Sequence, residues 1–130
     1  MKKNFCAVCV LTLILILTMA VSISHAAVPA WQADGIIPLT EIEYSGLSVS
    51  RSGVSVKLTN TSAADVKVSL RLAFLDREGN TIGYSLFGLR EIEAGGYAAF
   101  SNNYLNGNWR ACRDASRMNF SRMTYEPIYY

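Results

Sequence analysis

The pattern of apolar and polar residues in the middle of the chain predicts β-strands. From Gly53 to Thr59 an apolar side chain occupies every second position, which places one face of a pleated strand in a core and the other in water. The segment from Val66 to Phe74 repeats this alternation, and the polar residues 60–65 between the two segments predict a loop. One buried and one wet face are typical of antiparallel strands.

The flanking segments predict further short strands separated by turns. Residues 42–44 and 47–49 alternate in opposite phases, which predicts a β-bulge at Ser45-Gly46. Asp76 and Gly79 predict a hairpin turn over residues 76–80, and strands are expected near 81–87, 89–93, 97–104 and 120–125. Turn signals spaced about 8 to 12 residues apart indicate a mainly β fold, an immunoglobulin-like two-sheet antiparallel β-sandwich.

The C-terminal third departs from strand periodicity and predicts one short helix from Trp109 to Met118. Helical spacing places Ala111, Ala115 and Met118 on one face and a row of arginines on the other. Asn108 is suited to cap the helix at its start. We expect this amphipathic helix to lie on the sandwich or across its end.

Three segments carry a family resemblance: Asn60-Thr61-Ser62, Leu72 to Gly83, and Ile92 to Phe100. They are similar to the FxLYD-type domains of bacterial extracytoplasmic proteins, in which an alternating strand ends in an aspartate turn and a glycine turn leads to a phenylalanine. The similarity covers roughly residues 53–101, and the five-residue signature reads Leu72-Ala73-Phe74-Leu75-Asp76, identical only at the aspartate. The resemblance implies an immunoglobulin-like sandwich, with no catalytic residue carried over and no known ligand.

The N-terminus has the three regions of a secretory signal peptide. Lys2 and Lys3 precede an uncharged apolar run, and Ser24-His25-Ala26 places small residues where a signal peptidase reads. We therefore expect a signal peptide over residues 1–26, cleaved after Ala26, an N-terminal tail or linker over 27–39, and the sandwich over 40–130. The protein would be secreted or periplasmic. The alternative is an anchor, because the run from Phe5 to Ile23 nearly reaches the about 20 residues of a spanning helix.

Loss of the leader removes most residues that could support catalysis or metal binding. The single histidine, His25, and two of the three cysteines lie within it, which leaves Cys112 as the one thiol. Imidazole metal sites, Ser-His and Cys-His nucleophiles and internal disulfides are thereby excluded, and neither a metal nor a cofactor is expected. Cys112 is interpreted as a small buried hydrophobe, with an intermolecular disulfide as the alternative.

The charge of the exported chain is balanced. Of the 12 lysines and arginines, Lys2 and Lys3 lie in the leader, so the remainder equals the 10 aspartates and glutamates. A balanced charge does not favour binding to nucleic acid, and no stable membrane insertion is expected after cleavage. Any electrostatic recognition of a partner must therefore come from a local cluster of charged side chains.

Two carboxylate pairs are candidate catalytic groups. Glu41 and Glu43 share one face of a strand, as do Glu91 and Glu93, in the way a glycan-cleaving pair would. Because Ile42 takes the opposite face, a solvated strand face explains the first pair better. The sequons at Asn60 and Asn119 matter only in a eukaryotic secretory pathway, whereas the leader looks bacterial.

Two adjacent features form the candidate binding site. The segment from Asn102 to Trp109 combines amides and aromatic rings that could stack on a sugar and donate hydrogen bonds to it, although a polar loop before a helix has the same composition. The arginine stripe could grip carboxylate or phosphate groups, although it also fits a wet helix face. The site residues are Tyr104, Asn106, Asn108, Trp109, Arg110, Arg113 and Arg117.

The sequence therefore predicts an exported binding or interaction module of the bacterial cell envelope without catalytic activity. Its partner would be a protein or an anionic envelope polymer. Two alternatives remain open, namely a carboxylate-based glycan-acting enzyme and a structural or assembly protein that pairs through an edge strand.

Overall fold

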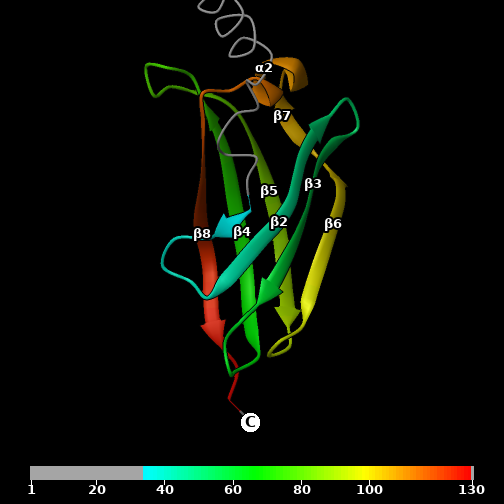
Figure 1. Ribbon diagram of the computed structural model, residues 1–130, viewed down its shortest axis with the longest axis vertical. Coiled ribbons are helices and arrows are strands. Elements are labelled where there is room, and N and C mark those ends of the chain that lie inside the picture. Colours follow the sequence, from blue (N-terminus) through cyan, green and yellow to red (C-terminus); the bar gives the residue numbers. More distant parts are fainter. Residues whose placement is uncertain (1–33, 130) are drawn as a thin grey trace, which may run out of the picture.

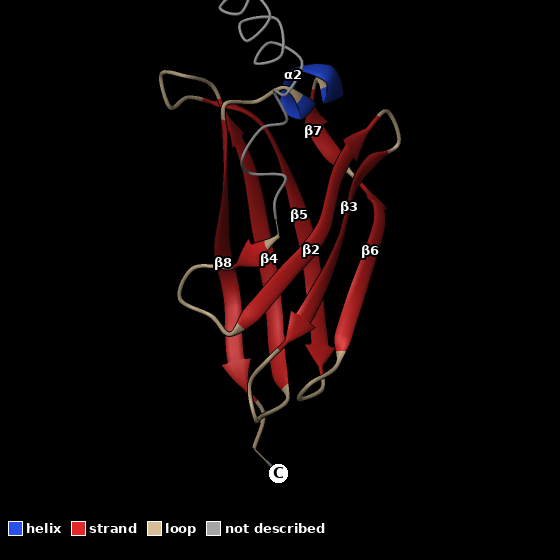
Figure 2. Ribbon diagram, viewed as in Figure 1, coloured by secondary structure: helices blue, strands red, loops and turns tan. Residues whose placement is uncertain are grey.

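Two four-stranded antiparallel sheets face each other across one hydrophobic core (Figure 1, Figure 2). The computed structural model describes residues 34–129, so the predicted signal peptide and its cleavage site lie outside the described residues. In order across the first sheet, the strands are β1 (Gly35–Ile36), β2 (Ile42–Ser50), β3 (Gly53–Asn60) and β6 (Tyr97–Asn103). In order across the second, they are β7 (Leu105–Gly107), β5 (Thr81–Ile92), β4 (Val66–Leu75) and β8 (Arg117–Pro127).

One short helix, α2 (Trp109–Arg113), joins β7 to β8 at one end of the sandwich (Figure 1). The predicted fold class, a mainly β two-sheet antiparallel sandwich with a short C-terminal helix, is confirmed. In the range 34–129, no helix is both long enough and apolar enough to cross a membrane.

The core lies between the sheets and is built from the alternating residues that the sequence indicated. Leu70, Leu72 and Phe74 of β4 are fully buried, and each such side chain contributes about 1.5 to 3 kcal/mol by leaving water. Aromatic contacts bridge the two layers, because Phe87 lies edge-on to Phe100 of the opposite sheet with ring centres 4.9 Å apart. The predicted alternation of buried and outward side chains in β3 and β4 is thus confirmed.

Bulges correct the register of β2 and β5. In β2 the pairing with β3 shifts between Ser45 and Ser48, and Gly46 has φ +62°, so the predicted bulge is confirmed. The prediction of two strands, 81–87 and 89–93, is wrong, because β5 runs unbroken to Ile92. Phe87 pairs with Leu70 and Arg90 pairs with Val68, so a second bulge between Phe87 and Arg90 keeps the strand continuous.

The predicted linker over residues 27–39 is wrong where the structure describes it. Gly35 and Ile36 form β1 by pairing with β2, and Ile37 is fully buried. The hydroxyl and N–H of Thr40 both donate to the carbonyl of Ile37, which turns the chain into β2. The sandwich therefore includes residues before position 40. A two-residue strand is too short to show periodicity, which explains the error.

The predicted helix over 109–118 is correct only in its first half. Asp114 caps the C-terminus of α2, and the N–H of Ser116 then donates to the carbonyl of Leu75 in β4. From Arg117 on, the chain pairs with β4 as β8, so Met118 belongs to a strand. Pairing with β4, a strand of ten residues, outweighs the helical spacing of the apolar residues in this segment.

Candidate functional site

The orientation of α2 is fixed at its start and in its middle. At its start, the side-chain carbonyl of Asn108 accepts hydrogen bonds from the N–H groups of Arg110 and Ala111, at 3.0 and 3.1 Å. In its middle, Cys112 is fully buried. Its sulfur packs so closely on Gly83 that any side chain at position 83 would collide with it. Burial also raises the pKa of the Cys112 thiol. The interpretation of Cys112 as a buried hydrophobe is therefore confirmed, and its inaccessible sulfur opposes an intermolecular disulfide.

With Cys112 turned inward, α2 presents two arginines around one tryptophan. Trp109 is half-buried against the core, and the guanidinium carbons of Arg110 and Arg113 each lie 5.2 Å from the centre of its ring. Both cations are thus within reach of the electron-rich ring face. Sharing one ring keeps two positive charges together on the surface and restricts the freedom of both side chains.

Arg113 also contacts a carboxylate. Its Nε lies 3.2 Å from one oxygen of Asp114, and its Nη2 lies 3.4 Å from the other, so the contact is bidentate. The two side chains are 45% and 70% exposed, and such surface pairs contribute little to stability.

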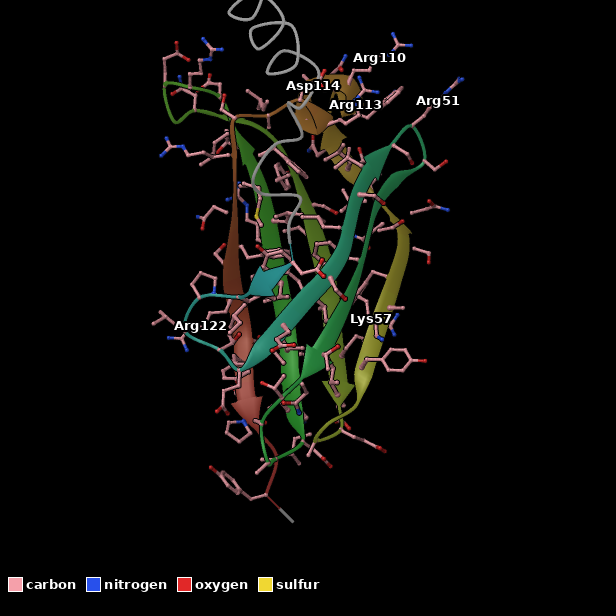
Figure 3. All side chains as sticks on the ribbon, in the orientation of Figure 1. Arg51, Lys57, Arg110, Arg113, Asp114 and Arg122 are labelled. Carbon is pink, nitrogen blue, oxygen red and sulfur yellow. The ribbon has the colours of Figure 1, made fainter. Side chains whose placement is uncertain are left out.

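A hollow of about 170 Å³ lies beside this cluster. Tyr104 lines it with a side chain that is 79% exposed, and Arg51 lines it from the turn between β2 and β3. Figure 3 shows Arg51, Arg110 and Arg113 at the same end of the sandwich, with Lys57 and Arg122 farther along it. The complete lining consists of Ser50, Arg51, Ser52, Gly53, Tyr104, Leu105, Gly107 and Trp109.

Sequence reasoning missed Arg51. An arginine in a short polar turn carries no signal of its own, and only the packing of α2 against β2 brings it to the same end as Trp109. Its place follows only once the fold puts the β2–β3 turn at the helix end of the sandwich.

Three of the predicted site residues have other roles. Asn108 caps α2, and the side-chain amide of Asn106 donates to the hydroxyl of Tyr84 at 3.0 Å. Arg117 belongs to β8, and its Nη2 lies beside Gly79 in the β4–β5 turn. The predicted stripe of three arginines on one helix face is therefore wrong, because α2 ends at Arg113.

The carboxylates occupy other surfaces. Glu43 is exposed on β2, as a solvated face requires, and Glu91 pairs with Lys67 at 3.9 Å. A second hollow, of about 270 Å³, is lined in part by Asp34, Glu43 and Tyr44. Burial raises the pKa of Tyr44, and the negative charge of Asp34 raises it further. Across residues 34–129, no three or more acidic, cysteine or histidine side chains converge to hold a metal ion.

Comparisons of the whole chain with protein-family models, curated proteins and solved structures find no match. The resemblance to FxLYD-type domains therefore stays a prediction.

Proposed function

We propose that this chain is an exported binding or interaction module of the bacterial cell envelope, without catalytic activity, and that the α2 end of its sandwich is the binding surface. One observation carries this proposal: Arg110 and Arg113 share the ring of Trp109 beside a hollow that Arg51 also lines. The partner is an anionic envelope polymer or an acidic patch of a protein.

The leader supports the location. Lys2 and Lys3, the apolar run and the small residues up to Ala26 direct export, followed by cleavage after Ala26. The mature protein is then secreted or periplasmic, and retention of the leader as an anchor is the alternative. Arg51, Arg110 and Arg113 lie close to one hollow in a chain with balanced charge, and they create a local positive field, which attracts anions and weakens as salt is added.

The binding surface is tested with a pair of double variants of equal charge. Arg110→Gln/Arg113→Gln removes the cations on Trp109, whereas Lys57→Gln/Arg122→Gln removes two cations elsewhere on the sandwich (Figure 3). We expect the first variant to lose about tenfold or more in retention on immobilised anionic envelope polymer at low ionic strength, with an unchanged thermal midpoint. The second should retain most of the binding. Equal losses would show a nonspecific charge effect and would contradict the assignment of the surface.

A second candidate function, assembly through an edge strand, is favoured by β8. This 11-residue strand pairs with β4 on one side, and no other described strand pairs with its opposite edge. Pairing between copies would appear as a mass that rises with protein concentration. The α2 site requires no such change in mass.

A further inference from the structure

The contact between Arg113 and Asp114 has the geometry in which a guanidinium recognises a carboxylate ligand. Nε and one terminal nitrogen of Arg113 face the two oxygens of the same carboxylate. Both side chains are substantially exposed, so an external carboxylate can reach the guanidinium from solvent. Exchanging one exposed carboxylate for another conserves the number of charge-assisted hydrogen bonds.

We propose that the ligand of this site is a carboxylate-bearing polysaccharide, one of whose carboxylates displaces Asp114 from Arg113. This inference rests on the proposed function. Asp114 is then an internal occupant that lowers the affinity of the site, and Arg110 and Arg51 provide further positive charge for carboxylates along the same polymer.

Trp109 and Tyr104 have different roles at this site. Trp109 is half-buried and already holds both guanidinium groups, so it is a positioning residue that acts through the arginines. Tyr104 lines the adjacent hollow and is 79% exposed, so its ring is free to stack on the face of a sugar. A stacking ring next to guanidinium groups fits a polymer of acidic sugars better than an acidic peptide.

The decisive experiment compares Asp114→Asn with Glu78→Gln in the mature protein. Both changes remove one negative charge at the α2 end, but only the first frees an arginine, since Glu78 is exposed in the β4–β5 turn. We expect Asp114→Asn to bind polygalacturonate about three- to fivefold more tightly at low salt and Glu78→Gln to change binding less than about twofold. Adding Arg113→Gln to Asp114→Asn should abolish the gain.

Two further variants separate positioning from stacking. Trp109→Leu preserves apolar packing but removes the ring, so it should reduce the salt dependence of polygalacturonate binding together with the affinity at low salt. Tyr104→Ala should weaken binding by a similar factor at low and high salt, because it removes stacking area. We expect the thermal midpoints of Trp109→Leu and Tyr104→Ala to stay near that of the parent protein. Tyr104→Phe, which keeps the ring, should bind polygalacturonate as tightly as the parent does.

Two results would overturn this inference while leaving the proposed function intact, and a third would overturn both. Equal effects of Asp114→Asn and Glu78→Gln, with Arg110→Gln/Arg113→Gln still weakening retention, would eliminate the displacement of Asp114. Binding to polyglutamate or inorganic polyphosphate at least as tight as to polygalacturonate would eliminate the acidic polysaccharide. If removing the arginines has no effect on retention by any anionic polymer, the binding surface itself is wrong.

Discussion

Asn60 shows how one polar side chain can hold two parts of the fold together. It is fully buried at the end of β3, and its side-chain amide donates to the carbonyls of Ile92 and Glu93, at 3.0 and 3.2 Å, as well as to that of Ala64. Its side-chain oxygen accepts from both the N–H and the hydroxyl of Ser62. The residue therefore ties β3 to the end of β5, and its amide is enclosed in the fold.

Replacing Asn60 with Ala should lower the free energy of unfolding by about 3 kcal/mol, because buried carbonyl groups lose their donor. The matched control is Asn119→Ala, since Asn119 is exposed on β8. That change should cost less than about 0.5 kcal/mol. Urea denaturation of the mature protein measures both, and a similar cost at the two positions would contradict a structural role for the Asn60 amide.

At the scale of elements, the strands with a buried face were predictable and the irregular elements were not. β3 and β4 alternate in sequence because each packs one face on the core. By contrast, the bulge in β5 depends on its partner, since the residues after Phe87 must rejoin the ladder at Arg90 opposite Val68. The end of α2 likewise depends on β4, which pairs with the chain from Arg117 onward.

The two faces of β4 should respond differently to the same substitution. Leu72 is fully buried, so Leu72→Asp places an unpaired carboxylate in the core and should cost several kcal/mol. Arg71 lies on the outer face with its guanidinium 4.9 Å from the ring centre of Tyr84, so Arg71→Asp should cost about 1 kcal/mol or less. Denaturant melts of both variants measure the contrast. Equal losses would mean that β4 is buried on both faces.

At the scale of the whole molecule, the two ends of the sandwich differ in charge. The α2 end also carries the β2–β3 and β4–β5 turns (Figure 1), where five cations outnumber the acidic residues Asp76, Glu78 and Asp114; the cations are Arg51, Arg77, Arg110, Arg113 and Arg117. The opposite end holds the β3–β4 loop, the β5–β6 turn and the end of β8, where five acidic residues outnumber Lys67 and Arg90; the acidic residues are Glu41, Asp65, Glu91, Glu93 and Glu126. The sequence gives only the balanced total, because this separation arises from how turns far apart in the chain meet.

Opposite charges at the two ends should orient the protein on an anionic polymer, with α2 toward the polymer. Cysteine substitutions at Ser52, in the hollow beside Tyr104, and at Ala94, in the β5–β6 turn, report on the two ends. Because Cys112 is buried, a thiol reagent should label only the introduced cysteine in each folded mature variant. Polygalacturonate at low salt should slow thiol labelling several-fold at position 52 and leave it unchanged at position 94, and added salt should remove the protection. Equal protection of both thiols would show binding without a preferred end.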